Sequence, residues 1–475
     1  MTTRSDEVRP GSLFVAIRGT STDGHAFVGE AVARGAAAVV VERDFPGDPG
    51  VPTLRVDDTR RASAELAAAW YGHPARRLRL VGITGSLGKT SILSMLEAMV
   101  AETNVKVGAV GSLGVHVDQD VRSDTGHTAP GPLLLHRELA RLAAEGCELV
   151  AMEVTSHALV QERVHGLRFD LGVFTNLVPL EHSEFHPTFR DYAAAKVRFF
   201  DHLRPCAPLV FNIDSRVVRR LVHEADAEPI GCGTGRAALV RVDSREMDAD
   251  GSRFELDVRR PLPRVGGGET PTGRFPLRLR LLGYANIANA ALAATAALCL
   301  GVGPEAIGAA LAGLPRQPRR LQLIHQGRFI VLDDTVGHPD SISALFQVVE
   351  RFEPRRVHVA FAVRGQRGER VNRHTAEALA IWSRSVPSGR MVVTRSEEAA
   401  DERNQVEDRE LSAVTDALRA HGVVFEIRER LDAAVRDVLA VAQDGDLVLL
   451  LGAQGMDPGQ EVARAWLGQE VGPTS

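Results

Sequence analysis

The chain contains the stretch Leu78-Arg79-Leu80-Val81-Gly82-Ile83-Thr84-Gly85-Ser86-Leu87-Gly88-Lys89-Thr90, in which an apolar segment runs into a glycine turn and then a helix-forming segment. A buried strand, a glycine turn and a helix N-terminus together form the context that a phosphate-binding loop requires. Glycines let backbone N–H groups approach phosphate oxygens, and the helix N-terminus favours an anion. The stretch therefore predicts a nucleotide site rather than a glycine-rich turn with a surface lysine. The predicted nucleotide-binding residues are Gly85, Ser86, Gly88, Lys89, Thr90 and Ser91.

Two side chains of this loop carry the expected chemistry. Lys89 can bridge the β- and γ-phosphates of ATP, and the Thr90 hydroxyl can ligate Mg²⁺. The spacing departs from the GxxxxGK[ST] pattern, because Ile83 stands where that pattern has its first glycine. The prediction of ATP and Mg²⁺ as cofactors therefore depends on the strand–turn–helix context.

Composition narrows the classes of protein. The formal net charge is -5, so no overall basic field suggests a nucleic-acid partner. The four cysteines form no CxxC pair, which argues against a zinc ribbon or a disulfide scaffold and fits a reducing compartment. The N-terminus has no apolar signal-peptide region, and no uncharged apolar run reaches transmembrane length. We therefore expect a cytoplasmic protein without membrane insertion.

Strands and helices alternate along the chain, which predicts an α/β protein with mostly parallel sheets. We expect three domains, as a chain of 475 residues exceeds one ordinary core. Residues 1–76 read as a small N-terminal α/β domain. Residues 77–315 read as a central phosphate-loop ATPase domain, whose parallel sheet carries an antiparallel excursion over residues 239–242, 254–258 and 277–281. Residues 316–475 read as a Rossmann-like C-terminal domain.

Further motifs follow the loop in a fixed order. They are Thr128-Ala129-Pro130, Met152-Glu153-Val154-Thr155-Ser156-His157-Ala158-Leu159, Arg163-Val164, Tyr192-Ala193-Ala194-Ala195-Lys196 and Asn286-Ile287-Ala288-Asn289. Together with the loop they resemble the motifs of the Mur ligase family, in its branch that adds the third residue of the peptidoglycan peptide. The resemblance is specific over about residues 8–300 and weaker in the last third.

The resemblance implies an ADP-forming, amide-forming ligase: ATP converts a carboxylate into an acyl phosphate, which an amine then attacks. It implies an acid-binding N-terminal domain, a central ATP domain and an amine-binding C-terminal domain. The expected substrates are a small-molecule acid and amine, such as a UDP-linked muramoyl peptide and an amino acid. We expect a monomer or a small homo-oligomer in peptidoglycan biosynthesis or a related pathway.

By resemblance, the catalytic residues are Lys89, Glu153, His182 and Lys196, and the metal ligands are Thr90, Glu153, His182 and Lys196. The family carries a lysine carbamate at the position of Lys196, whereas the residue pattern alone would predict a solvated helix lysine. Asn286 and Asn289 are implied to reach the adenine, although either could cap a helix. The remaining implied contacts are Arg320 and Asp334 for ATP, and Ser5, Thr128, Pro130, Ser156, His157, Arg163 and Asp457 for the substrates. For His157, a core histidine is an equal alternative.

Several positions depart from the family pattern. Arg4-Ser5-Asp6 stands where the family has an Asp-Ser-Arg segment that helps bind uridine, and Gly455-Met456-Asp457 stands for Gly-His-Glu. The Asp-Asn-Pro-Arg segment that selects diaminopimelate is absent, because Arg395-Ser396-Glu397 follows Val393-Thr394. The ATP and metal positions are thus largely kept, whereas the sugar-nucleotide and amine positions have changed.

Three interpretations follow from this uneven pattern. The favoured one is a specialised ligase that uses the same chemistry on a non-standard acid or amine. The second is a housekeeping muramoyl-dipeptide ligase that does not use diaminopimelate. The third is an inactive nucleotide-binding partner, which the retention of Lys89, Glu153, His182 and Lys196 disfavours.

Overall fold

A computed structural model describes residues 1–19, 22–123, 128–179, 185–248, 251–315, 319–336, 338–366, 368–400 and 404–470. The chain divides into two compact units: residues 1–243, 256–275 and 289–311 form the first, and residues 244–255, 276–288 and 312–475 form the second. Both contain parallel sheet and helices, which confirms the predicted α/β class. The domain boundaries at residues 76/77 and 315/316 stay predictions. Among the described residues, none of the helices is long and apolar enough to span a membrane.

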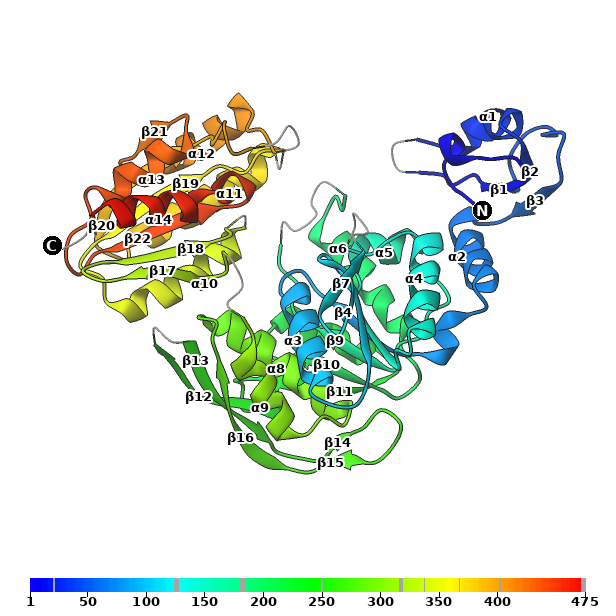
Figure 1. The fold of residues 1–475 in the computed structure, drawn as a ribbon, viewed down its shortest axis with the longest axis horizontal. Helices are drawn as coiled ribbons and strands as arrows, with labels where there is room; N and C mark the ends of the chain where they lie inside the picture. The colour runs from blue at the N-terminus through cyan, green and yellow to red at the C-terminus, as the bar shows by residue number, and fades with distance from the viewer. Residues whose placement is uncertain are drawn as a thin grey trace. The chain divides into compact units, whose positions relative to one another are not determined.

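The first unit opens with a three-stranded parallel sheet (Figure 1). Its elements are η1 (Ser5–Glu7), β1 (Ser12–Val15), η2 (Gly24–Phe27), α1 (Val28–Ala33), β2 (Ala36–Glu42), β3 (Thr53–Val56) and α2 (Thr59–Trp70). Side chains alternate across β2, so that Val39 and Val41 pack in the apolar cluster of α1, while Val40 packs with Ala62 of α2. Helices therefore cover both faces of this small sheet.

An eleven-stranded sheet follows, in the order β16-β13-β12-β11-β10-β9-β4-β8-β5-β6-β7. Strand β4 pairs in parallel with β8 on one side and with β9 on the other. The strands are β4 (Arg79–Thr84), β5 (Val107–Gly111), β6 (Gly114–Val117), β7 (Asp120–Ser123), β8 (Leu149–Glu153), β9 (Leu171–Phe174), β10 (Ala207–Asn212), β11 (Ala227–Gly233), β12 (Val240–Asp248), β13 (Gly251–Val258) and β16 (Gly273–Leu279). The carboxyl ends of β8 and β9 thus flank the end of β4, which is where ligands bind in open α/β sheets.

Helices cover this sheet, and short irregular elements connect it. Leu80, Val150 and Met152 share one apolar cluster with Leu139 and Leu142 of α4. The edge pairs β5–β6 and β6–β7 are antiparallel, and a short antiparallel hairpin, β14–β15, precedes β16. The other elements are η3 (Pro74–Arg77), α3 (Lys89–Ala101), α4 (Pro132–Ala144), α5 (Ser156–Val160), α6 (Phe189–Val197), η4 (Arg198–His202), α7 (Arg216–Leu221), η5 (Val222–Glu224), β14 (Leu262–Pro263), β15 (Glu269–Thr270), α8 (Tyr284–Cys299) and α9 (Pro304–Gly313).

The second unit contains a six-stranded sheet in the order β17-β18-β22-β19-β20-β21. Its elements are β17 (Gln322–Gln326), β18 (Ile330–Asp334), α10 (Pro339–Val349), η6 (Glu350–Phe352), β19 (Val357–Ala362), α11 (Gly368–Ser383), β20 (Ser388–Thr394), α12 (Asp408–Ala420), β21 (Glu426–Arg428), α13 (Leu431–Leu439), β22 (Leu447–Gly452), η7 (Gln454–Met456) and α14 (Gly459–Glu470). Except for the antiparallel β17–β18 pair, these strands pair in parallel.

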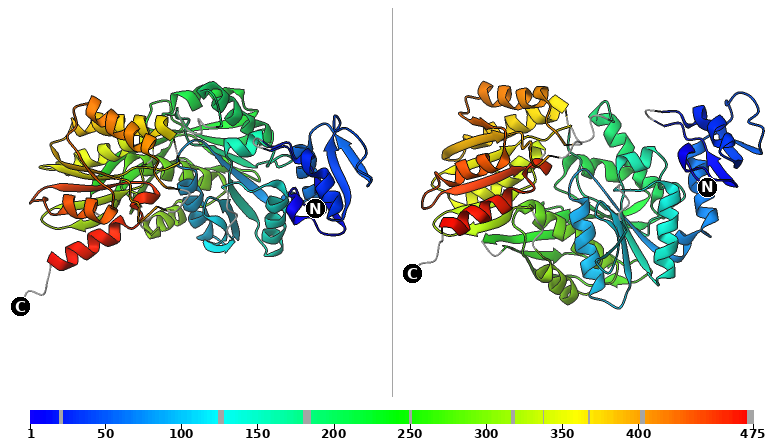
Figure 2. Two further views of the ribbon diagram at one scale, coloured as in Figure 1. Left: turned by 90° about the horizontal axis from the view of Figure 1, so that it is seen from above. Right: turned by 45° about the horizontal axis from the view of Figure 1, so that its top comes forward.

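Alternating side chains give this sheet two apolar faces, as the prediction of a doubly wound domain requires. On β22, Leu447 and Leu449 belong to the cluster that contains residues of α10, α11 and α12. The neighbouring Val448 and Leu450 belong to the cluster formed with α13 and α14. Figure 2 shows helices on both sides of these strands.

Arg319 ties together the carboxyl ends of β18 and β22. Its side chain is buried, and its Nε donates to both carboxylate oxygens of Asp333 at 3.3 Å. Its terminal nitrogens donate to the backbone oxygens of Ala453 at 2.8 Å and Gly452 at 2.5 Å, and it also pairs with Asp457. Burial raises the pKa of Asp333 to about 6, an effect that Arg319 opposes. The charge on Asp333 therefore depends on this guanidinium.

Replacing Arg319 with methionine should destabilise the second unit, because Asp333 would remain buried without its cation. Removal of one partner of a buried ion pair costs about 3–5 kcal/mol. For a unit of this size that corresponds to a Tm lower by roughly 6–20 °C, which calorimetry can measure. Arg320→Met is the matched control, since Arg320 is exposed. Equal Tm values for the two variants would show that the Arg319 pair contributes nothing to stability.

Candidate active site

The glycine turn after β4 has a backbone that only glycine adopts easily. Gly85 has φ +134° and Gly88 has φ +87°. A Cβ atom on Gly85 would lie 2.0 Å from Thr175 Oγ1, and one on Gly88 would lie 2.4 Å from Asn289 Oδ1. Both glycines are therefore required by close neighbours as well as by conformation. The structure also brings Asn289 to the loop.

The end of β9 holds the loop in place. The backbone N–H groups of Ser86 and Leu87 donate to the backbone and side-chain oxygens of Asn176, each at 2.9 Å. The Thr175 hydroxyl donates to the Leu87 carbonyl at 2.7 Å. Ser86 Oγ lies 2.9 Å from the Tyr192 hydroxyl. These contacts fix the loop before any ligand arrives, which is the preorganisation that phosphate binding needs.

Lys89 begins α3 and folds back over the loop. Its Nζ donates to the carbonyl oxygens of Gly85 at 2.9 Å and Ser86 at 2.7 Å. Ser91 lies in the same first turn and is half-buried. The cation, the loop and the N-terminus of α3 therefore meet at one place, as the sequence predicts for a phosphate site.

Glu153 is the last residue of β8, and its side chain is 1% exposed. Its Oε1 accepts hydrogen bonds from the Thr90 hydroxyl at 2.9 Å and from the Ser112 backbone at 2.8 Å. The Ser112 hydroxyl in turn lies 2.9 Å from that of Thr128. A hydroxyl and a carboxylate beside a phosphate loop are the oxygen donors that Mg²⁺ prefers. Thr90 and Glu153 therefore fit the predicted metal site.

Lys196 is buried on α6, with 1% of its side chain exposed. Its Nζ donates to Thr84 Oγ1 at 3.1 Å and to the Val154 carbonyl at 3.4 Å. The ammonium also lies 5.8 Å from the centroid of the Tyr192 ring. Burial of a cation is costly unless the site supplies partners, so the alternative of a solvated helix lysine is excluded.

Of the predicted acid-substrate residues, Thr128 is linked to Glu153 through Ser112, and Arg163 contacts the residue that follows Thr128. Arg163 donates to the Ala129 carbonyl at 2.6 Å, between Thr128 and the buried Pro130, and burial lowers the pKa of its guanidinium. The Ser156 hydroxyl is buried, and within the described ranges it has no hydrogen-bond partner. The half-buried His157 packs against Phe185, with ring centroids 4.1 Å apart and the ring planes tilted by 35°. An unsatisfied buried hydroxyl is a place where a ligand can bind.

Other predicted residues lie elsewhere. Asn286 lies in the first turn of α8, and its side-chain amide donates to the Leu282 carbonyl at 2.7 Å. In the N-terminal sheet region, the Ser5 hydroxyl donates to Glu30 at 3.2 Å. In the second unit, Arg320 is exposed, Asp457 pairs with Arg319, and burial raises the pKa of Asp334 to about 6. Asp334 accepts a hydrogen bond from the Leu321 backbone at 3.0 Å. His182 lies outside the described residues.

The sequence reasoning missed several residues of the site. Thr84 bridges Lys196 to the Val154 carbonyl, to which its hydroxyl donates at 2.8 Å. Ser112 supports Glu153, and Tyr192 contacts Ser86. A signal existed for Ser112, which directly follows the apolar strand β5 at the same edge of the sheet as the loop. The strand prediction did not include β5, so Ser112 was not placed at the edge of the sheet.

Three family models match the chain. They are described as "Mur ligase family, catalytic domain" over residues 1–71, "Mur ligase middle domain" over residues 83–297 and "Mur ligase, glutamate ligase domain" over residues 319–454. The chain is 35% identical to the UDP-N-acetylmuramoyl-L-alanyl-D-glutamate--2,6-diaminopimelate ligase of Geobacillus kaustophilus, covering 94% of this chain and 88% of the relative. It is 34% identical to the UDP-N-acetylmuramyl-tripeptide synthetase of Roseiflexus sp. over 94% and 88% of the two chains.

Solved structures share the fold. A structure of a UDP-N-acetylmuramoyl-L-alanyl-D-glutamate--2,6-diaminopimelate ligase matches with a TM-score of 0.68 and 20% identity, covering 99% of this chain and 95% of the other. The MurF ligase of Thermotoga maritima, solved with ADP, matches with a TM-score of 0.67 and 19% identity, covering 99% and 98%.

Gly88→Ala should weaken the binding of ADP at least tenfold, which is about 1.4 kcal/mol. The new Cβ would be forced against Asn289 at a φ of +87°, so the loop must move. Isothermal titration calorimetry measures the affinity. Gly29→Ala is the control, because a Cβ at Gly29 of α1 meets nothing within 4 Å. Unchanged ADP affinity in Gly88→Ala would remove this loop from the nucleotide site.

Proposed function

The chain belongs to the Mur ligase family. We propose that it joins an acid to an amine through an acyl phosphate, that the acid or the amine is non-standard, and that the amine is not diaminopimelate. The family membership, with relatives at 35% and 34% identity over 94% of the chain, places it among ATP-dependent ligases of the tripeptide-synthetase type.

In the first step, a carboxylate oxygen of the acid attacks the γ-phosphorus of ATP, the bond to the bridging oxygen breaks, and ADP leaves. The loop N–H groups and Lys89 stabilise the negative charge that is transferred, since phosphoryl transfer depends mainly on positioning and electrostatics. Thr90, Glu153 and His182 would hold Mg²⁺, which neutralises phosphate charge when bound. The Thr90–Glu153 hydrogen bond of 2.9 Å supports this assignment for two of the three residues.

In the second step, the amine nitrogen attacks the acyl carbon, the phosphate leaves, and the nitrogen loses a proton to give the amide. We assign Lys196 a carbamate, formed when its neutral amine adds CO₂ and releases a proton. An anion at this position would attract a metal that an ammonium repels. Its burial beside Thr84 and Val154, at the end of β8, supports this role.

The observation that carries the amine proposal is the pairing of Arg395. The distal carboxylate of diaminopimelate requires a cation, usually a bidentate arginine. Arg395 is the arginine that follows Val393 and Thr394, and its guanidinium pairs with Asp408 and, at 3.5 Å, with Glu429. These two carboxylates already neutralise it. A substrate carboxylate would have to displace them.

The acid side has changed in a similar way. Arg4 pairs with Asp6 at 2.6 Å and Ser5 donates to Glu30, so these side chains have partners within the protein. A second candidate function is the housekeeping muramoyl-dipeptide ligase with another amine. It is favoured by the match to the relative named as a UDP-N-acetylmuramyl-tripeptide synthetase, a name that specifies no amine, over 88% of that relative. The relative from Geobacillus kaustophilus is named for diaminopimelate, so its name supports the acid of this candidate and not the amine.

A panel of acids and amines distinguishes the two candidates by phosphate release from ATP. We expect little turnover with UDP-muramoyl dipeptide plus diaminopimelate. Each unmade hydrogen bond in a desolvated pocket costs roughly 1–3 kcal/mol, so two or three weaken binding by orders of magnitude. Lys89→Ala is the control for contaminating ATPase activity. Efficient turnover of that pair contradicts the proposal. Turnover of the UDP-muramoyl dipeptide with another amine establishes the second candidate.

Lys196→Ala should lower ligation at least about 10²-fold, as the loss of one electrostatic group at a reacting centre does. Millimolar acetate or formate should restore part of the activity, because a small carboxylate can replace the carbamate. Lys106→Ala is the matched control, since Lys106 donates to the Glu145 carbonyl at 2.8 Å, outside this cluster. Full activity of Lys196→Ala would show that Lys196 has no role in ligation. Loss of activity without rescue by the carboxylate would show that Lys196 acts only through the structure and not as a carbamate.

A further inference from the structure

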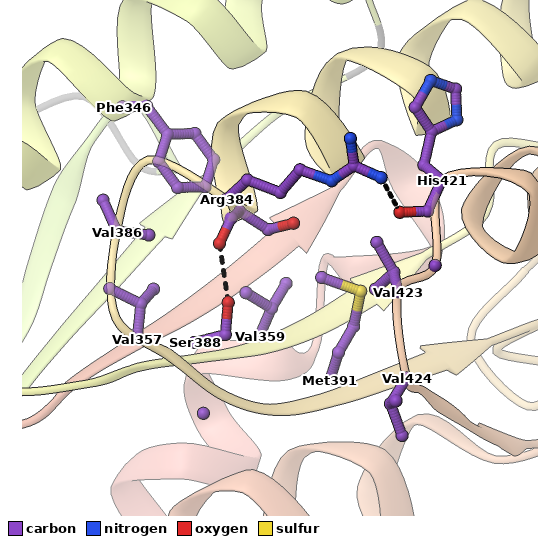
Figure 3. A pocket seen from close by; sticks show the side chains of 13 residues that line it. Phe346, Val357, Val359, Arg384, Val386, Ser388, Met391, His421, Val423 and Val424 are labelled. Atoms are coloured by element: carbon purple, nitrogen blue, oxygen red, sulfur yellow. Dashed lines mark hydrogen bonds between the residues drawn. The ribbon is translucent and has the colours of Figure 1, made fainter.

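A cavity of about 220 Å³ lies on one face of the six-stranded sheet of the second unit (Figure 3). It is situated where β19 and β20 begin, and Val357, Val359 and Met391 line it from the sheet. Phe346 of α10 and Val386 line it from the helix side. Close-packed protein interiors contain few voids larger than one water molecule. A cavity of this size is therefore an opening that the packing maintains.

The lining determines what can occupy the cavity. On the sheet side the lining is apolar, because valine and methionine side chains supply none of the two to four polar partners that a buried water needs. The polar side chains that line the cavity are those of Ser383, Arg384, Ser388 and His421. An apolar cavity of about 150 Å³ stays dry and accepts a benzene-sized molecule in another protein. The volume here exceeds that value, so the cavity has room for one aromatic ring.

The mouth of the cavity carries a positive charge. Arg384 follows the end of α11, and its guanidinium donates to the backbone oxygen of His421, just beyond α12 (Figure 3). That bond holds the guanidinium at the rim and uses one of its five N–H donors. Within the described ranges, no carboxylate forms an ion pair with Arg384. The charge is therefore available to an anion.

A second feature of the rim is an apolar residue in solvent. Val424 lines the cavity and is 89% exposed, the most exposed of the large apolar side chains that the structure describes. Exposed apolar surface beside a cavity is typical of a ligand site, because the ligand removes it from water. The rim thus combines a fixed cation with apolar surface.

We propose that this cavity binds a small aromatic carboxylate, with the ring at the starts of β19 and β20 and the carboxylate at Arg384. The apolar lining selects the ring, and the guanidinium selects the anionic group through charge-assisted hydrogen bonds. The site is separate from the phosphate loop in sequence and chemistry, and it does not depend on the proposed function.

Titration of the full-length protein with phenylacetate tests the proposal, with its neutral isostere phenylacetamide as the second probe. We expect one site for phenylacetate with a Kd on the order of 1 mM or tighter. Arg384→Gln should weaken phenylacetate at least tenfold and leave phenylacetamide nearly unchanged. Arg373→Gln, an exposed arginine on the same helix α11, is the matched control and should bind both probes like the wild type.

Val357→Phe fills the cavity from the sheet and should abolish the binding of both probes. Calorimetric unfolding checks that this variant is folded; if it is not, the comparison of Arg384→Gln with Arg373→Gln carries the test. Absence of phenylacetate binding to the wild type overturns the proposal, and so does equal binding to Arg384→Gln. Phosphate release from ATP, measured in the same variants, should be unaffected, so that a failure here is distinct from a failure of the ligase proposal.

Discussion

Both units of this protein depend on charges that have been taken out of water. Glu153 and Lys196 are almost completely buried in the first unit, and Asp333 and Arg319 are buried in the second. An unpaired charge in a dry interior costs several kcal/mol, so each of these groups can exist only where donors or counter-charges converge on it. Thr90 and Ser112 supply donors to Glu153, whereas Asp333 receives the guanidinium of Arg319. The surrounding backbone therefore has to bring hydrogen-bond donors and counter-charges to these buried groups.

Parallel strands bring these donors and counter-charges together. Because the carboxyl ends of parallel strands gather at one edge, loops that are far apart in sequence deliver their polar groups to the same place. At the end of β4, the glycine loop receives hydrogen bonds and contacts from β9, while the carboxylate comes from β8. The same principle operates where β18 and β22 end beside Arg319. The family chemistry therefore follows from sheet topology as much as from any single motif.

The sequence was sufficient where the information is local. The loop from Gly85 to Thr90 and the alternating strands of the second unit need only neighbouring residues to be recognised. It was insufficient for short strands at a sheet edge. Strands β3 and β7 are short and partly exposed, so their apolar pattern is weak. It was also insufficient where the partner of a side chain lies far away in the sequence. Of the two adjacent arginines, sequence reasoning selected Arg320. The structure leaves Arg320 exposed and buries Arg319, whose backbone has φ +57° and whose guanidinium pairs with Asp333. Nothing in the local pattern reveals that turn.

The position of β22 has a consequence for how the protein is made. This last strand lies between β18 and β19, so before it is present the sheet consists of two separate pieces, β17–β18 and β19–β20–β21. Contacts between residues far apart in sequence form slowly, and exposed strand edges invite association with other chains. During synthesis the second unit must wait until the ribosome has released residues 447–452. Chains that are truncated before that point would present two open sheet edges to the cell, where chaperones and proteases act on such edges.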